Sequence, residues 1–303
     1  MFKKLAVNII LVAAVVFVLD FAIGRGLRYF YFRETSGFHY RTTYSMEQAD
    51  AEVLIFGSSR ANHHYVPEVF EDSLNQSFYN TGRDGNGIFY QAALLRSILK
   101  RYTPKVIILD YRGEFGKNKQ EYDQLSSLLP YYRTHPEIRD IVALRSPYEK
   151  LKLGSEIYPF NSQALTIAIG NLELNKERQA DNKGYVALET TWPPEMQVFT
   201  STESYVVDSN KVNAFREFVV NAKQSGARLY VVYSPLYQKL ALNQEVDICR
   251  SICAEEQVPF LDYSKDPFFI TRQELFFDVV HLNHKGATLF SSMVASAIRN
   301  GHL

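Results

Sequence analysis

The sequence has few of the residues that define several common protein classes. Only two of its 303 residues are cysteines, which excludes a disulfide scaffold, and the spacing of Cys249 and Cys253 matches neither a zinc ribbon nor a thioredoxin-like motif. We expect both to be small buried hydrophobic side chains. There is no excess of either charge, because 33 Lys and Arg balance 33 Asp and Glu. This balance argues against a nucleic-acid partner.

The rest of the composition is that of a globular protein with a large core. Hydrophobic residues make up 46% of the chain and charged residues 22%, which excludes both a disordered chain and a wholly polytopic membrane protein. At about 150 residues per domain, the length allows one large or two ordinary domains. The chain contains no internal repeat, low-complexity tract or long run of charge.

One long hydrophobic run begins close to the N-terminus. The stretch from Leu5 to Ile23 is apolar apart from Asn8 and Asp20. As a helix it extends about 28 Å, close to the hydrocarbon thickness of a bilayer. Arg25 and Arg28 follow, together with a run of aromatic residues, as is typical of a membrane interface. The pattern predicts a membrane anchor or signal segment over residues 1–33.

Two other interpretations of this run stay open. Ala22-Ile23-Gly24 supplies the small residues that a signal peptidase needs, so the run also fits a cleaved signal peptide, and a buried core helix is a third interpretation. Anchor and signal peptide both predict that the rest of the chain is exported. We therefore expect an extracytoplasmic domain, periplasmic or at the cell surface, held by the anchor or secreted if the run is cleaved.

From residue 50 onward, short strand-like apolar runs alternate with longer segments of helical spacing, the pattern of parallel strands joined by helical crossovers. It predicts an α/β fold, a flavodoxin-like three-layer sandwich with a parallel five-stranded sheet, preceded by the N-terminal hydrophobic helix. The expected helices are residues 90–101, 209–225, 243–257 and 284–299. The expected strands are residues 52–56, 77–80, 105–110, 228–233 and 259–262.

The segment between the third and fourth strands is long. Residues 112–207 hold no comparable strand run, but helical spacing recurs near residues 137–152 and 162–176. A structureless loop of this length is implausible in a compact domain. We expect a mostly helical insertion at about 113–207, within a domain that spans residues 34–303.

Ligands of an open parallel sheet bind at the carboxyl ends of its strands. The first expected strand ends in Phe56-Gly57-Ser58-Ser59, which places two hydroxyls at the turn into the first helix. Free backbone N–H groups and the helix dipole stabilise negative charge there, so a serine is suited to be a nucleophile and to supply one arm of an oxyanion hole. The alternative is that Ser58 or Ser59 only caps the helix.

A second motif lies just before the last expected helix. Asp278 and His281 are three residues apart. One short turn therefore allows the carboxylate to orient the imidazole, and to stabilise the imidazolium that forms when the ring accepts a serine proton. Together with Ser59, this pair predicts a catalytic triad.

These motifs resemble those of the SGNH, or GDSL-like, hydrolase superfamily over roughly residues 50–300, and are closest in style to its membrane-anchored cell-envelope members of the D-alanine-transfer and alginate-acetylation type. Gly57-Ser58-Ser59 looks like the first block, with Ser59 as nucleophile. Gly85 matches the family glycine whose backbone N–H joins that of Ser59 in the oxyanion hole. Asp278 and His281 match the last block. The resemblance implies the SGNH hydrolase fold.

The third block of that family differs here. Where the family has an asparagine that donates to the oxyanion, this chain has Asp110-Tyr111-Arg112-Gly113-Glu114. A carboxylate at Glu114 cannot replace a neutral amide donor unless it is protonated, and losing one such donor costs about 2.7 to 4 kcal/mol in the transition state. Two backbone donors would then need help from Arg112 or from the insertion. Arg60, Arg83, Arg112 and Glu114 are candidates for contact with substrate.

Neither a metal nor a cofactor is expected. His63-His64 lacks the spacing of a metal site on a helix, and the glycine-rich segment after the second strand lacks the Walker lysine of a nucleotide-binding loop.

The motifs predict a serine-dependent ester hydrolase or O-acyltransferase, with acetyl as the expected group, that acts on exported carbohydrate or a cell-envelope polymer. Its expected partners are an acylated carbohydrate or small ester, the membrane, and a membrane-bound acyltransferase. The triad alone does not separate hydrolase from transferase, because exclusion of water decides between them. The rival interpretation is a non-catalytic SGNH-like protein that binds glycan or assembles with a membrane acyltransferase, since fold does not guarantee function.

Overall fold

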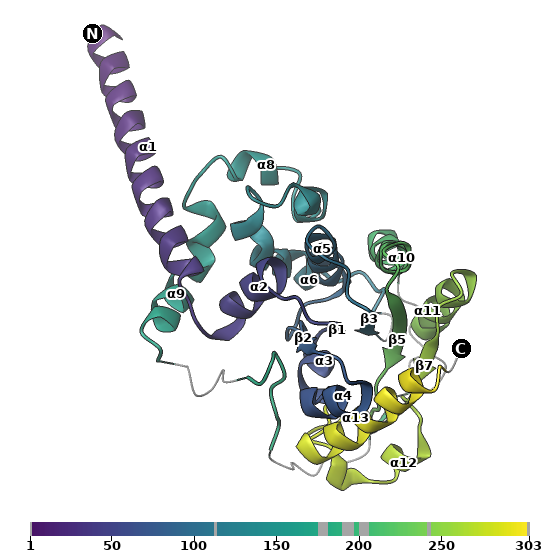
Figure 1. Ribbon diagram of the computed structural model, residues 1–303. Helices are drawn as coiled ribbons and strands as arrows, with labels where there is room; N and C mark the ends of the chain where they lie inside the picture. Colours follow the sequence, from purple (N-terminus) through teal and green to yellow (C-terminus); the bar gives the residue numbers. More distant parts are fainter. Residues whose placement is uncertain are drawn as a thin grey trace. The chain divides into compact units, whose positions relative to one another are not determined.

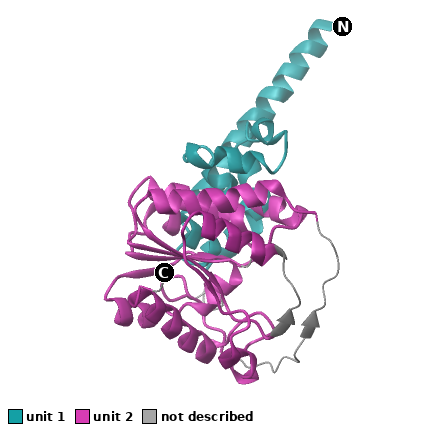
Figure 2. Cartoon of the chain, turned by 90° about the vertical axis from the view of Figure 1, so that its right-hand side faces the viewer, with its two compact units in different colours: residues 1–43, 125–180 teal, residues 44–124, 181–303 magenta. Residues whose placement is uncertain are grey.

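The computed structural model of the protein describes residues 2–111, 114–174, 181–189, 197–199, 206–240 and 244–301. The chain forms two compact units, which Figure 2 colours separately: unit 1 is residues 1–43 with 125–180, and unit 2 is residues 44–124 with 181–303. The insertion expected at about 113–207 is divided between them, because residues 125–180 belong with the N-terminal segment. Each unit is described by itself below.

Unit 2 is built on a sheet of five parallel strands in the order β2-β1-β3-β5-β7. β1 and β3 are buried along their whole length, which is why continuous apolar runs predict them. The α/β class and the five parallel strands are confirmed, with every strand boundary within one residue of its prediction. The strands are β1 (Val53–Gly57), β2 (Phe78–Asn80), β3 (Val106–Asp110), β5 (Arg228–Tyr233) and β7 (Phe260–Asp262).

Helices cover both faces of this sheet (Figure 1). α3 (Ser59–His64), α4 (Pro67–Leu74) and α13 (His284–Arg299) pack on one face. α5 (Ile88–Leu99) and α10 (Ser209–Gln224) pack on the other. The crossovers therefore form one layer above and one layer below the strands.

Strand side chains alternate between these two helical layers, as the pleat requires. Ile55 and Ile108 share a buried cluster with Phe290 of α13. Phe56 points to the other face, where its ring contacts that of Phe218 on α10 at 5.2 Å between centroids. Both faces of the central strands β1 and β3 are therefore dry, whereas the edge strand β7 is partly exposed.

The strand order places a switch point at the carboxyl ends of β1 and β3. Counted along the sheet, the order is 2-1-3-4-5, which is that of flavodoxin-like doubly wound sheets, and it reverses between β1 and β3. A small parallel pair of β4 and β6 was not predicted. The remaining elements of unit 2 are β4 (Gln197–Phe199), β6 (Gln238–Leu240), α6 (Lys119–Gln124), α11 (Gln244–Glu255), α12 (Pro267–Ile270) and the 3₁₀ turn η5 (Gln273–Leu275).

Unit 1 combines the N-terminal segment with the middle of the chain. Tyr131 joins the two parts, because its hydroxyl lies 3.2 Å from the hydroxyl of Tyr31 and 2.7 Å from Oγ1 of Thr43. The elements of unit 1 are α1 (Phe2–Phe32), α2 (Gly37–Glu47, which continues into unit 2), η1 (Leu125–Tyr131), η2 (Pro136–Ile138), α7 (Arg139–Ala143), α8 (Glu149–Lys152), η3 (Tyr158–Gln163) and α9 (Ala164–Asn171).

The N-terminal run forms a single apolar helix, as predicted. α1 is long and apolar enough to cross a membrane, and no residue of its most apolar window is buried. Figure 1 shows its N-terminal half extending away from the other elements of unit 1. Large apolar side chains from Leu5 to Leu19 are therefore exposed in the isolated chain.

The second half of α1 is held by the turn that precedes η3. The carboxylate of Asp20 accepts hydrogen bonds from Oγ of Ser155 at 2.5 Å, from the backbone N–H of Glu156 at 2.7 Å and from that of Ile157 at 3.3 Å. Gly24 lies against the same turn, since a Cβ there would be 2.3 Å from the carbonyl carbon of Glu156. The only acidic residue of the apolar run is thus fully partnered within its own unit.

Candidate active site

The turn between β1 and α3 places Ser59 at the carboxyl edge of the sheet. Gly57 has a φ of 146°, and a Cβ at this position would lie 2.7 Å from the backbone oxygen of Asp110. Only glycine lets β1 end this close to β3 and turn at once into the helix. Ser58 precedes the helix without capping it through its side chain, and Ser59 is the first helical residue.

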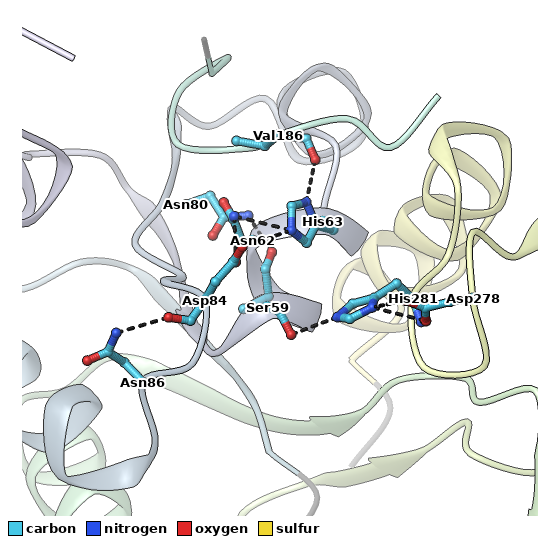
Figure 3. A network of polar contacts seen from close by, with 10 residues as sticks. Ser59, Asn62, His63, Asn80, Asp84, Asn86, Val186, Asp278 and His281 are labelled. Atoms are coloured by element: carbon cyan, nitrogen blue, oxygen red, sulfur yellow. Dashed lines mark hydrogen bonds and ion pairs between the residues drawn. The ribbon is translucent and has the colours of Figure 1, made fainter. Parts of the chain in front are cut away.

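A continuous line of hydrogen bonds joins three of the predicted residues (Figure 3). Oγ of Ser59 lies 2.7 Å from Nε2 of His281, and Nδ1 of His281 lies 2.8 Å from Oδ2 of Asp278. An ionised carboxylate only accepts, so Nδ1 carries the proton, and Nε2 of the neutral ring is left to accept the proton of Ser59. The structure thus brings Ser59, His281 and Asp278 together in the order that a nucleophile, a base and its orienting acid require.

The carboxylate of Asp278 is itself held in place. Its Oδ1 accepts the backbone N–H groups of Val280 and His281, each at 2.8 Å. Burial acts to raise the pKa of Asp278, but the hydrogen bond from the His281 ring, the two backbone bonds and the electrostatic attraction of that ring outweigh it, so the pKa is lowered. The group is therefore an anion at neutral pH, as an orienting acid must be.

His64, also on α3, holds the segment that carries His281. The backbone N–H of Leu282 donates to Nε2 of His64 at 2.9 Å, so the ring is neutral and carries its proton on Nδ1. Burial is the main cause that keeps the pKa of His64 well below its ordinary value. Its buried Nδ1 has no hydrogen-bond partner among the described residues. α3 therefore positions Ser59 directly and His281 through Leu282.

A second polar cluster lies beside Ser59 in Figure 3. Nδ1 of His63 lies 2.7 Å from the carbonyl oxygen of Val186, and Nε2 of His63 lies 3.3 Å from Oδ2 of Asp84. Nδ2 of Asn62 donates to Oδ1 of Asp84 at 2.7 Å. The rings of His63 and His281 meet edge to face, 5.7 Å between centroids. This cluster ties the loop after β2 to the helix that begins with Ser59.

That loop carries the expected oxyanion glycine. Gly85 follows Asp84 directly and adopts a left-handed φ of 73°. The backbone N–H of Arg83 donates to the carbonyl of Gly57 at 3.1 Å, which fixes the loop to the end of β1. The guanidinium of Arg83 lies over the ring of Tyr90, 5.6 Å from its centroid. The role of the Gly85 N–H as an oxyanion donor stays a prediction.

Arg60, a predicted substrate-contacting residue, is buried below the site and does not reach its surface. Its Nε lies 3.2 Å from Oδ1 of Asp110, whose Oδ2 accepts the hydroxyl of Tyr65 at 2.9 Å. The side chains of Arg60 and Asp110 are 6% and 0% exposed. Burial alone lowers the pKa of an arginine, but the charges of Asp110 and Glu114 raise that of Arg60. The acid that ends β3 is therefore engaged in an internal ion pair.

Two more predicted contact residues follow β3. Arg112 lies outside the described residues. Glu114 is described, and its backbone carbonyl accepts a hydrogen bond from Nζ of the buried Lys211 at 3.1 Å. Contact of Arg112 and Glu114 with substrate stays a prediction.

In the described part of the chain, the two thiols are buried and possible metal ligands do not cluster. Cys249 and Cys253 are free and buried, as expected. Burial raises the pKa of both thiols, that of Cys253 to about 12. Within the described part of the chain, no group of three or more His, Cys, Asp or Glu side chains is placed to hold a metal ion.

No protein-family model matches this chain, and a search of curated proteins found no match. The interpretation of the site therefore depends on its geometry and on its motifs.

Two features of the site were not predicted from the sequence. In a helix that begins at Ser59, residues three and four positions later share its face, so the spacing of Asn62 and His63 was a usable signal. The partner of both, Asp84, gave no such signal because it comes from a separate loop. The bond between His64 and Leu282 was equally hidden, because it joins residues 218 positions apart.

Proposed function

We propose that the protein is a serine-dependent ester hydrolase or O-acyltransferase of the SGNH type, acting on exported carbohydrate or a cell-envelope polymer. The observation that carries the proposal is the hydrogen-bonded line from Oγ of Ser59 through His281 to Asp278, at 2.7 and 2.8 Å. Its position at the switch point of a doubly wound sheet supports the same conclusion, because ligands of such sheets bind there.

In the proposed reaction Ser59 attacks the ester carbonyl while Nε2 of His281 takes its proton. The tetrahedral intermediate collapses as the imidazolium returns this proton to the departing alcohol, which leaves an acyl group on Oγ. Water or a sugar hydroxyl then repeats the sequence in reverse, with His281 again as the base. Asp278 keeps the ring in the required tautomer and stabilises its charged form.

The site offers few hydrogen-bond donors for the oxyanion that forms on the ester oxygen. We assign it to the backbone N–H groups of Ser59, at the start of α3, and of Gly85. The loop of Gly85 is fixed to α3 by Asp84 and to β1 by Arg83, which supports a preorganised donor. Asp110 cannot contribute, because its carboxylate is buried against Arg60 and Tyr65.

We further propose that α1 is retained as a membrane anchor, with the remainder of the chain extracytoplasmic. Cleavage near Ala22-Ile23-Gly24 would remove Asp20 and its three hydrogen bonds to the turn at Ser155, and would open the close contact of Gly24 with Glu156. A disposable leader has no need of such contacts, whereas an anchor that carries a folded unit does.

The first test is ester turnover by the full chain in detergent, measured as release of p-nitrophenol from a short-chain ester and as covalent labelling by a fluorophosphonate. The proposal expects turnover and labelling that both disappear in Ser59→Ala. Ser58→Ala is the matched control, because its hydroxyl makes no cap and lies outside the relay. A folded parent chain that neither turns over nor labels would contradict catalysis.

That negative outcome would favour a non-catalytic glycan-binding or assembly protein. One observation supports this second candidate: the segment after β3 lacks the asparagine of the family that the motifs resemble, and Asp110 at its start is internally paired. Binding of acetylated and deacetylated envelope polysaccharide to Ser59→Ala separates the two functions, because a binding protein retains affinity for the deacetylated form.

A further inference from the structure

The contacts of Asp20 fix where the turn of residues 155–157 lies along the axis of α1. Asp20 accepts three hydrogen bonds from residues 155–157, and the run ends three residues later at Ile23. At about 1.5 Å per residue, this turn lies about 4–5 Å inside the end of the run. If α1 spans a bilayer, the 155–157 turn therefore lies at the boundary between hydrocarbon and headgroups.

The short helix α8 comes just before this turn and presents a face suited to that boundary. Leu151 is 79% exposed and Tyr148, immediately before the helix, is 67% exposed. Lys150 and Lys152 are exposed beside them. Figure 1 shows α8 at the edge of unit 1 toward which α1 extends. An aromatic ring, an aliphatic side chain and lysines together are typical of the membrane interface.

The acidic residue of α8 is turned away from this face. Glu149 is buried, and its Oε1 accepts hydrogen bonds from Arg145 at 2.9 Å and from the hydroxyl of Tyr158 at 2.5 Å. Its Oε2 lies 3.3 Å from Nζ of Lys152. These contacts hold α8 against the body of unit 1 and leave apolar and cationic groups outward.

We propose that Tyr148, Leu151 and the two lysines of α8 form a second membrane contact, which docks unit 1 onto the anionic lipid surface beside α1. The proposal rests on the retention of α1 as an anchor. The height set by Asp20 brings this face to the lipid without further rearrangement, and lysines attract anionic headgroups. A single helix leaves an attached unit free to swivel, whereas two contacts fix its orientation on the membrane.

The test uses the full chain in lipid nanodiscs of phosphatidylcholine and phosphatidylglycerol. Leu151→Cys is labelled with an environment-sensitive fluorophore, and lipids carrying a quencher near the headgroup are then introduced. We expect a blue-shifted emission and a loss of fluorescence with the quencher lipid. The parent chain is the labelling blank, because its two cysteines are buried.

Leu172→Cys is the matched control in the same unit. Leu172 is 68% exposed, and its neighbour Asn171 donates to the carbonyl of Phe30 at 2.9 Å. Phe30 is ten residues beyond Asp20, so this level of unit 1 lies about 15 Å farther from the membrane along α1. The label at position 172 is expected to keep its emission and to resist quenching.

The charged part of the contact has its own variant. Lys150→Glu is expected to reduce quenching at position 151 in phosphatidylglycerol discs and to change it much less in pure phosphatidylcholine. Equal behaviour of labels 151 and 172 would overturn the proposal, as would protection of position 151 that requires an added membrane protein. Co-elution with the discs reports anchoring by α1, and ester turnover reports the proposed function, so each failure is recognised separately.

Discussion

At the scale of single residues, the site depends on Asp278 as much as on the groups it orients. Its carboxylate accepts from the ring of His281 and from two backbone N–H groups of its own turn. The backbone N–H groups of the turn therefore orient the carboxylate, and the carboxylate fixes which ring nitrogen of His281 carries the proton. This local arrangement is why a motif of two residues three positions apart was readable in the sequence.

Asp278→Asn is expected to lower kcat/KM for a short-chain ester by on the order of 10³–10⁴-fold, because an amide that donates to the ring favours the wrong tautomer. The side chain is 39% exposed, so the midpoint of thermal unfolding should change little. Steady-state kinetics beside a thermal melt of the same sample check both statements. Full activity in this variant would remove Asp278 from the mechanism.

Asp110 is expected to matter for stability instead. Asp110→Asn leaves the buried guanidinium of Arg60 without its counter-charge, which should cost about 3–5 kcal/mol in the free energy of unfolding. Glu217→Gln, which removes the half-exposed partner of Arg96, is the control and should cost less than about 1 kcal/mol. Urea unfolding measures the free energy of unfolding of both variants. Similar losses would show that the buried ion pair of Arg60 and Asp110 contributes no more to stability than the half-exposed pair.

At the scale of elements, the junction between α1 and the turn before η3 joins an apolar helix to a folded unit. Gly24 and Gly26 face different surroundings there. A Cβ at Gly24 would overlap Glu156, whereas a Cβ at Gly26 would meet no atom within 4 Å. The same glycine-to-alanine substitution can therefore be compared at a position with a steric overlap and at one without.

Gly24→Ala is expected to destabilise unit 1 by about 1–3 kcal/mol, the usual cost of overpacking. Gly26→Ala should be neutral or stabilise by up to about 1 kcal/mol, since alanine is the better helix former. Hydrogen exchange of residues 139–171 in nanodiscs should become faster only in the first variant. Unchanged exchange in Gly24→Ala would mean that α1 and the turn separate in solution.

The elements of unit 2 were largely predictable from the sequence. Runs such as Val106–Asp110 are rich in β-branched residues and fully buried, so a nearly continuous apolar stretch marks their ends within one residue. The division of the chain was not predictable. It depends on contacts such as that between Tyr31 and Tyr131, whose 100-residue separation leaves no local pattern.

At the scale of the whole molecule, stability should decline on mild acidification. His64 is buried and neutral, with its pKa lowered mainly by burial. The unfolded chain binds a proton at this residue below about pH 6.5, whereas the folded chain does not. Unfolding is therefore favoured increasingly as the pH falls through this value. Asp278, with a lowered pKa, contributes in the opposite range, since its stabilisation is present above about pH 3.9 and is lost only below it.

His64→Gln is expected to flatten the decline in unfolding free energy between about pH 7.5 and pH 5.5, because it removes the titrating ring and keeps an acceptor for the N–H of Leu282. His284→Gln is the control, since His284 is exposed and should leave the decline in place. Chemical unfolding at the two pH values measures each slope. A parent-like slope in His64→Gln would assign the acid sensitivity to another group.

The bond between Ser59 and His281 joins residues 222 positions apart, one at the start of the first helix packed on the sheet and the other in the loop just before the last helix. During synthesis the serine is made long before its base exists. Its hydroxyl remains an ordinary alcohol until α13 has docked and brought the final loop to α3. Under the proposed function, a nascent, truncated or half-translocated chain is chemically silent, and the first ester turned over marks the completion of folding.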